Sequence, residues 1–407
     1  MNLKIGILTF HRSINYGAFM QCYSLSKRLQ ADFPEASIEV IDYTSSIIEL
    51  QYRNRITNAP TPEIGKQLKA QEEAFCASLS ALPLSSWRCV SDDPLELAAY
   101  LNEHYDIVIV GSDAVWNWNV RGFPNGYFLK DYHGKKLSYA ASAHGQSFYD
   151  MTPEQKQYLS DAFHDFSYIG VRDCSTEKML HYIDSDLDVH HNCDPTLLLE
   201  MDLLPCDTDL LKTKLERSGI DLKRPIVGLM ASGDVVGKQL RKYMDPSVQF
   251  AAVYAPNQWA DAYLYDLSPF EWAKTFSYFG ATVTHFFHGT LLSLVNGTAV
   301  FPVELGTSYT THYQTKINDV LTRMNLLNWY RQIDDSGIIK RGLKKCGIPI
   351  NGRLWKDISE DVTTALLNRA SNAKLIQAAV QKEKESYNAF KHVLQKCIDE
   401  LKEKKSG

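Results

Sequence analysis

Short apolar runs alternate with polar, glycine-containing loops and with helix-period stretches along most of the chain. The first such unit runs from an apolar stretch at residues 3–9, through a polar loop that ends at Gly17, into a helical stretch at residues 18–30. A strand, a glycine loop and a helix in this order are typical of the opening of a doubly wound parallel sheet. The pattern therefore predicts an α/β fold.

The alternation continues and then restarts about halfway along the chain. Further strands are predicted at residues 38–43, 105–110, 136–142, 168–171 and 189–192, with a helix at 153–166. After a polar stretch at residues 205–224, a second strand, loop and helix follow at 225–244, then strands at 249–254, 281–284 and 299–303, and helices at 269–279 and 288–296. We therefore expect two Rossmann-like domains, at residues 1–204 and 205–358.

Two stretches lie outside this alternation. Residues 44–104 carry scattered prolines and helical periodicity, which predicts a largely helical insertion in the first domain. Residues 359–407 form one long helical pattern that ends in a Lys- and Glu-rich tail. We expect this helix to pack back across both domains.

Composition narrows the class of protein. The 407 residues exceed what one hydrophobic core supports, and 43 Lys and Arg against 48 Asp and Glu give a net charge of −5. This balance gives no general attraction to nucleic acid or to an anionic membrane. The eight cysteines show no metal or disulfide pattern, and no apolar stretch approaches the length of a membrane span. We expect a cytoplasmic enzyme with no metal and no transmembrane segment. Contact with the inner face of the membrane, if it occurs, would be peripheral.

The most informative stretch for chemistry is residues 282–298. A buried strand ends near Thr284 and a helix begins around Gly289, with His288 at the junction. A helix start presents unpaired N–H groups and the positive end of the dipole, which suit phosphate or carboxylate. We expect His288, Gly289 and Thr290 to face such an anion. The alternative is that His288 caps the helix or satisfies a buried carbonyl.

Arginine and aspartate residues follow several predicted strands. Arg172 lies just past one of them, where its guanidinium can bind a carboxylate or phosphate through two hydrogen bonds. The alternative is a salt bridge to Asp173 or Glu177. Asp113 and Asp194 are either site carboxylates or helix caps, and Pro195 favours the cap for Asp194.

The loop after the first strand carries Asn15-Tyr16-Gly17, in which Gly17 lets the backbone approach a ligand or lets the helix pack tightly. This loop is not a dinucleotide motif. The chain has neither G-x-G-x-x-G after this strand nor G-x-x-x-x-G-K-[ST] anywhere, so NAD-binding and P-loop chemistry lack their usual basis.

Taken together, these motifs resemble the polysaccharide pyruvyl transferase family. The resemblance rests on Asn15-Tyr16-Gly17-Ala18 with Gln21, Gly111-Ser112-Asp113 with Trp116-Asn117, Ser138-Tyr139-Ala140-Ala141-Ser142, Val171-Arg172-Asp173, Cys193-Asp194-Pro195-Thr196 and Phe287-His288-Gly289-Thr290. The motifs are weak singly but specific in combination, and they span residues 5–330. The chain departs from the family pattern at His285, where Asp is usual, and at Ala114, where Gln is usual.

The resemblance implies a GT-B-like pair of domains with a small anionic substrate in the cleft between them. It also implies transfer of the enolpyruvyl unit of phosphoenolpyruvate onto a sugar or lipid-linked glycan, giving a pyruvate ketal and phosphate, with no other cofactor. His288 is then the acid/base or phosphate ligand, Arg172 the anion clamp and Asp113 a further catalytic residue. The implied substrate-binding residues are Asn15, Tyr16, Gly17, Ser112, Trp116, Gly289 and Thr290. Two alternatives stay open: a GT-B glycosyltransferase that uses a nucleotide sugar, and a non-catalytic relative that binds the anion only.

Overall fold

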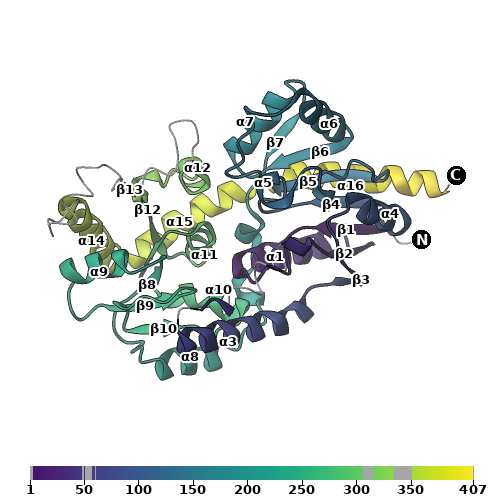
Figure 1. The fold of residues 1–407 in the computed structure, drawn as a ribbon. Coiled ribbons are helices and arrows are strands. Elements are labelled where there is room, and N and C mark those ends of the chain that lie inside the picture. Colours follow the sequence, from purple (N-terminus) through teal and green to yellow (C-terminus); the bar gives the residue numbers. More distant parts are fainter. Residues whose placement is uncertain are drawn as a thin grey trace. The chain divides into compact units, whose positions relative to one another are not determined.

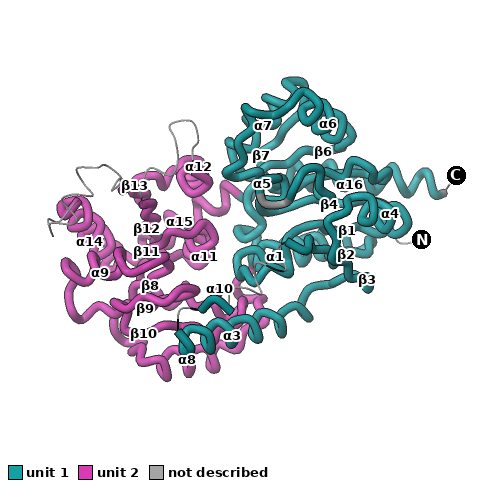
Figure 2. The backbone as a smooth tube through the Cα atoms, in the orientation of Figure 1, with its two compact units in different colours: residues 1–199, 384–407 teal, residues 200–383 magenta. Residues whose placement is uncertain are grey.

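The computed structural model describes residues 3–47, 50, 57–59, 61–305, 315–333 and 351–406. Residues 1–199 with 384–407 form one compact unit, and residues 200–383 form a second (Figure 2). Each unit is built on one sheet with helices packed beside it (Figure 1). The α/β class with two Rossmann-like sheets, which the sequence predicts, is confirmed.

The first unit contains a seven-stranded sheet in the order β3-β2-β1-β4-β5-β6-β7, with every neighbouring pair parallel. Its strands are β1 (Leu3–Leu8), β2 (Ala36–Thr44), β3 (Leu84–Val90), β4 (Ile107–Val110), β5 (Lys135–Ala141), β6 (Phe166–Val171) and β7 (Val189–His191). All four residues of β4 are buried, as expected for a parallel strand covered on both faces.

The helices of the first unit follow the strands in alternation. They are α1 (Tyr16–Asp32), α3 (Pro62–Ser78), α4 (Pro94–His104), α5 (Trp118–Arg121), α6 (Pro153–His164), α7 (Cys174–Ile183) and α16 (Tyr387–Ser406). Local sequence explains their starts. In α6, for example, Thr152 and Gln155 form a reciprocal capping box and Pro153 occupies the first helical position.

The predicted helical insertion at residues 44–104 is in part wrong. Residues 84–90 form β3, the edge strand of the sheet, and α4 connects it to β4. The apolar and aromatic spacing in this stretch fits a helix as well as a strand, and only pairing with β2 distinguishes them. Helix α3 agrees with the prediction, while residues 48–49, 51–56 and 60 lie outside the described residues.

The second unit contains a six-stranded parallel sheet in the order β10-β9-β8-β11-β12-β13. Its strands are β8 (Ile226–Met230), β9 (Gln249–Val253), β10 (Ala262–Leu264), β11 (Ala281–Thr284), β12 (Ala299–Leu305) and β13 (Arg331–Ile333). Its helices are α8 (Thr208–Arg217), α9 (Val235–Tyr243), α10 (Pro269–Thr275), α11 (Phe287–Val295), α12 (Lys316–Arg323), α14 (Gly352–Leu367) and α15 (Arg369–Lys384). A core of buried aliphatic and aromatic side chains joins β8, β11 and β12 to α9 and α14.

The predicted C-terminal helical segment is present as three successive helices, α14, α15 and α16. It begins at Gly352, earlier than the sequence pattern indicates, and the helices are separated at Asn368 and again at residues 385–386. Helix α14 packs on α9, β11 and β12 of the second unit, whereas α16 packs on β1, β5 and β6 of the first. The segment therefore contributes to the cores of both units.

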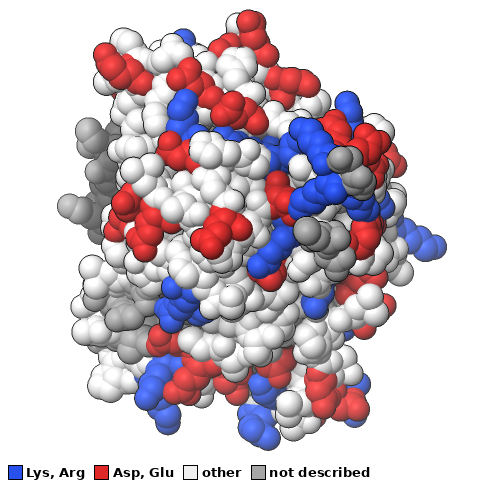
Figure 3. Space-filling model, turned by 90° about the vertical axis from the view of Figure 1, so that its right-hand side faces the viewer, with Lys and Arg blue, Asp and Glu red and all other residues white. Residues whose placement is uncertain are grey.

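Charged side chains of both signs are intermixed on the face shown in Figure 3. Near the C-terminus, lysines of α16 and its surroundings pair with acidic side chains, as in Lys135–Glu400, Lys402–Glu35 and Lys405–Asp106. Within the described part of the chain, no helix has the length and apolarity that a bilayer span requires.

Candidate functional site

Each sheet has one position where the chain winds outward in both directions. In the first unit this switch point lies between β1 and β4, and in the second it lies between β8 and β11. Doubly wound sheets bind ligands at the carboxyl ends of the strands beside such a point. Asp113 and Tyr254, which follow β4 and β9, also have φ angles of 78° and 69°. A left-handed backbone is uncommon for residues other than glycine, and it is often found at functional sites.

At the first switch point, Gln21 connects the loops that follow β1 and β4. Its amide nitrogen donates to Thr9 Oγ1 across 3.0 Å, and its amide oxygen accepts the Ser112 N–H across 3.2 Å. Thr9 Oγ1 in turn donates to the Ser112 carbonyl across 2.8 Å. Ser112 is fully buried, and these hydrogen bonds hold its loop in place.

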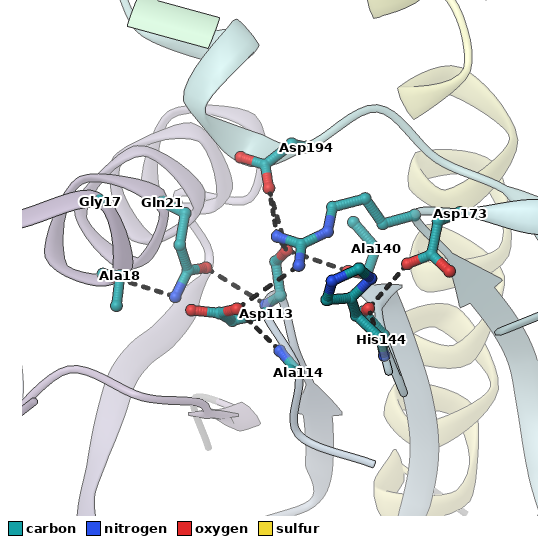
Figure 4. A network of polar contacts seen from close by, with 12 residues as sticks. Gly17, Ala18, Gln21, Asp113, Ala114, Ala140, His144, Asp173 and Asp194 are labelled. Atoms are coloured by element: carbon teal, nitrogen blue, oxygen red, sulfur yellow. Dashed lines mark hydrogen bonds and ion pairs between the residues drawn. The ribbon is translucent and has the colours of Figure 1, made fainter. Parts of the chain in front are cut away.

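Arg172 lies at the centre of a buried ionic cluster at the same sheet edge. Figure 4 shows this network from close by, with the aspartates Asp113 and Asp194 labelled. Nη1 donates to Asp194 Oδ2 across 2.7 Å, and Nη2 lies 3.4 Å from Asp113 Oδ1. Burial lowers the pKa of Arg172, but the charges of Asp194 and Asp113 outweigh burial and raise it overall. The alternative that the sequence left open, an ion pair, is thus present, although with different partners. The role of Arg172 as an anion clamp stays a prediction.

Two aspartates beside Arg172 also cap helical turns. Asp194 accepts the N–H of Thr196 across 2.9 Å, so the predicted cap is confirmed, and the same side chain also belongs to the ionic cluster. Asp173 caps α7 and accepts a hydrogen bond from Ser142 across 2.7 Å. Burial raises the pKa of Asp173, but the Ser142 hydrogen bond and the Arg172 charge hold it below its ordinary value.

Asn15, Tyr16 and Gly17 form the start of α1. The Asn15 side chain accepts the N–H groups of Gly17 and Ala18 across 3.0 and 3.3 Å. The Tyr16 hydroxyl donates to the carbonyl of Gln71 across 3.1 Å. These contacts account for the residues as a helix start, and their binding of substrate stays a prediction.

Trp116 lies in the core of the first unit. It is fully buried, its ring packs edge-on against Phe163 with centroids 4.8 Å apart, and its N–H donates to the carbonyl of Tyr127 across 3.2 Å. An indole so enclosed presents no surface to a sugar in this conformation. The aromatic spacing at this position therefore reflects packing.

Sequence reasoning missed a second polar group at the first sheet edge. His11 Nε2 lies 3.0 Å from Asp42 Oδ1, and Arg12 Nη2 donates to the other carboxylate oxygen across 2.5 Å. Burial raises the pKa of Asp42, but the hydrogen bonds from Arg12 and His11 place it well below its ordinary value. The signal was available in the sequence, since Asp42 interrupts an apolar strand and His11 and Arg12 directly follow another.

The second switch point carries the predicted histidine. Helix α11 begins at Phe287, so His288 lies in its first turn, and His288 is 9% exposed. The N-cap residue is Phe286, whose side chain offers no acceptor to the first N–H groups of the helix. Lys316, which sequence reasoning also missed, lies over the Phe287 ring at 5.1 Å from its centroid. The Lys316 ammonium therefore lies near the N-terminal end of the α11 dipole, and anion binding by His288 stays a prediction.

Gly289 and Thr290 have structural roles in α11. A Cβ on Gly289 would lie 2.6 Å from Thr284 Oγ1 and 2.7 Å from the sulfur of Met230, so only glycine allows the helix to approach the strand ends this closely. The Thr290 hydroxyl donates to the carbonyl of Phe286 across 3.2 Å, and the residue is fully buried. Their contact with an anion stays a prediction.

His285 follows β11 beside this helix start. The backbone N–H of Ser232, which follows β8, donates to Nδ1 of His285 across 3.3 Å. The histidine therefore joins the two loops that flank the second switch point. Within the described ranges, this site included, no group of three or more His, Cys, Asp or Glu residues could hold a metal ion.

Two doubly wound parallel sheets, each with polar side chains gathered at its switch point, define a protein of the two-domain Rossmann class. The chain belongs to the polysaccharide pyruvyl transferase family, whose family model matches residues 15–306. A search of curated protein sequences finds no match.

Several solved structures are distantly similar to this chain. The UDP-GlcNAc 2-epimerase of Methanocaldococcus jannaschii is 11% identical, with a TM-score of 0.47 over 89% of this chain and 100% of that one. The E. coli ADP-heptose lps heptosyltransferase II is 12% identical, with a TM-score of 0.38 over 90% and 100%. A glycosyltransferase from Rickettsia africae is 13% identical, with a TM-score of 0.43 over 95% and 99%.

Proposed function

We propose that this protein transfers the enolpyruvyl unit of phosphoenolpyruvate onto two hydroxyls of a sugar in a glycan or lipid-linked glycan. The observation that carries the proposal is the family match over residues 15–306, which includes the His288 motif at the start of α11. The product is a cyclic pyruvate ketal on the acceptor, and the second product is phosphate.

The reaction requires an acid, a base and charge stabilisation from the protein. One acceptor hydroxyl adds to C2 of phosphoenolpyruvate while the methylene carbon C3 takes up a proton and becomes a methyl group. The second hydroxyl then forms its bond to C2 as the C2–O bond to phosphate breaks. The two hydroxyl protons end on the methyl group and on the released phosphate, so atoms and charge balance. An acid for C3, a base for the hydroxyls and charge stabilisation for phosphate are therefore required.

We assign the donor chemistry to the second unit. His288 is nine-tenths buried in the first turn of α11, where the helix dipole favours an anion, and Lys316 adds a cation beside the same turn. His288 is the proposed acid for C3 or ligand of the phosphate. A positioned histidine in such a role contributes about 10²–10⁴-fold to the rate.

We assign the base for the acceptor hydroxyl to the ionic cluster of the first unit. The Asp113 side chain is 13% exposed, whereas the Arg172 and Asp194 side chains are each 1% exposed. Asp113 is therefore the member that an acceptor hydroxyl reaches most easily, and it is the proposed base. Arg172 holds that carboxylate in position through the contact between Nη2 and Oδ1.

Two release assays test the proposal against its main rival. The purified protein is incubated with a pool of glycan acceptors and either phosphoenolpyruvate or a set of nucleotide sugars. We expect acceptor-dependent phosphate release from phosphoenolpyruvate and no nucleotide release. Nucleotide release would establish a glycosyltransferase instead, and binding of phosphoenolpyruvate without turnover on any acceptor would establish a non-catalytic relative.

A further inference from the structure

His285 is held at the switch point of the second sheet through both its backbone and its ring, and its own N–H donates to the carbonyl of Met230 across 3.0 Å. It follows β11, and the loop that holds it follows β8, the neighbouring strand. Ser232 donates its N–H to Nδ1 of His285 across 3.3 Å. A backbone N–H can only donate, so Nδ1 must carry the lone pair and the ring proton of the neutral imidazole lies on Nε2.

That Nε2–H group is buried and has no hydrogen-bond acceptor among the residues that the structure describes. Buried donors in folded proteins are almost always satisfied, so a buried donor with no acceptor in the protein is a candidate to bind water, an ion or a ligand. His285 stands three residues before His288 and two before the first residue of α11, whose N-cap Phe286 provides no side-chain acceptor. Donors from the helix start and from His285 are therefore gathered at one strand end.

The charge state of the ring fits a donor that carries no charge. Burial lowers the pKa of His285 to about 4, so the imidazole is neutral at pH 7. A neutral ring adds a fixed hydrogen bond to an anion without adding a positive charge near the start of α11.

We propose that His285 binds the donor substrate directly, by donating its Nε2–H to an oxygen of the phosphate group. The inference deepens the proposed function, on which it rests, because it assigns to one side chain the phosphate end of phosphoenolpyruvate. Phosphate is the group that the start of a helix recognises best, and its oxygens are the acceptors that the gathered N–H donors require. His285 is on this account a substrate-binding residue rather than an acid or base.

Two substitutions of His285 distinguish the role of Nδ1, which accepts the Ser232 N–H, from the role of the Nε2–H donor. In His285→Asn the side-chain oxygen can still accept the Ser232 N–H, but the distal donor is lost. In His285→Gln an amide N–H lies at about the distance of Nε2, so part of the donor function remains. His181→Asn, at an exposed histidine of α7, is the matched control.

The test is calorimetric titration of the intact chain with inorganic phosphate, phosphoenolpyruvate and pyruvate, after thermal unfolding has shown that each variant is folded. We expect His285→Asn to weaken phosphate and phosphoenolpyruvate binding at least about tenfold, as for a lost hydrogen bond to a charged group. We expect a smaller loss in His285→Gln, and no change in pyruvate binding or in the control.

Three other outcomes contradict the inference or, in the last case, only the proposed function on which it rests. Unchanged phosphate affinity in His285→Asn, or no phosphate binding by the unaltered protein, would show that His285 is not a phosphate ligand. A loss confined to pyruvate would assign the ring to the carboxylate instead. Phosphate binding that depends on His285, in a protein that neither binds nor consumes phosphoenolpyruvate, would reject the proposed function and leave this contact in place.

Discussion

Arg172 Nη1 donates to Asp194 Oδ2 across 2.7 Å, and both side chains are 1% exposed. The pair connects the end of β6 to the turn that follows β7. Breaking a buried ion pair by removing one charge leaves the other uncompensated, which is costly even though the intact pair adds little net stability. Removing either charge of the pair is therefore expected to lower the stability of the fold.

We expect Asp194→Asn to lower the free energy of unfolding by about 3 kcal/mol, the low end for a broken buried pair, because Asp113 still compensates Arg172 in part. Urea denaturation measures this loss. Asp188→Asn is the control, since Asp188 pairs with His190 but its side chain is 88% exposed, and it should change stability by less than about 0.5 kcal/mol. Equal effects of the two substitutions would refute a stabilising role for the Arg172 cluster.

Gly289→Ala is expected to destabilise the second unit by about 1–3 kcal/mol, because the new methyl group would overlap Thr284 and Met230. Thermal unfolding reports the change. Gly65→Ala in α3 is the comparison, since its Cβ would meet only Ala59 at 3.5 Å, and alanine is favoured over glycine in a helix. If both variants unfold at the wild-type temperature, α11 does not need the close approach described above.

The partly buried imidazole of His285 should make stability depend on pH. Its pKa falls from 6.5 to about 4 on folding, because burial disfavours the charged ring. Between these values the unfolded chain binds more protons than the folded one, so stability is full above pH 6.5 and is lost as the pH falls towards 4. Urea denaturation at pH 7 and pH 4.5 should show a smaller acid loss in His285→Asn than in the unaltered protein. Parallel losses would mean that His285 is already protonated in the folded state.

Turnover should survive removal of divalent metal. In the proposed reaction the phosphate is neutralised by the start of α11, His288 and Lys316, which are protein groups. Phosphate release after dialysis against a chelator is the measurement, with Mg²⁺ or Mn²⁺ added back to a second sample. Activity that disappears on chelation and returns with metal would contradict this and would favour the nucleotide-sugar alternative.

The strand and helix pattern was predictable because buried parallel strands are short apolar runs with glycine or proline at their ends. The sheet containing β4 and the helix start at His288 follow directly from this pattern. Strand β3 was not predictable, since its apolar spacing suits both structures and only its pairing with β2 decides.

Contacts between side chains that are distant in the sequence were harder to predict than the strands and helices. Sequence places Arg172 and Asp194 after different strands, but their contact depends on sheet order, which the local pattern does not contain. The same reason hid the contact between Ser232 and His285, whose loops become neighbours only because β8 and β11 pair. The burial of Trp116 was also not predictable, since a motif places the residue near the sheet edge but does not show that its ring packs in the core.

The central claim is tested most directly by NMR of an acceptor glycan after incubation with the protein and phosphoenolpyruvate. Ketal formation turns the methylene group of phosphoenolpyruvate into a methyl group bound to the glycan, so a new methyl signal and free phosphate should appear in equal amounts. We expect both signals with the unaltered protein and at least about a hundredfold slower appearance with a folded His288→Ala variant. Unchanged rates in that variant would remove His288 from the mechanism. A pool of cell-envelope glycans and lipid-linked precursors that gains no methyl signal, while a nucleotide sugar is consumed, would contradict the account.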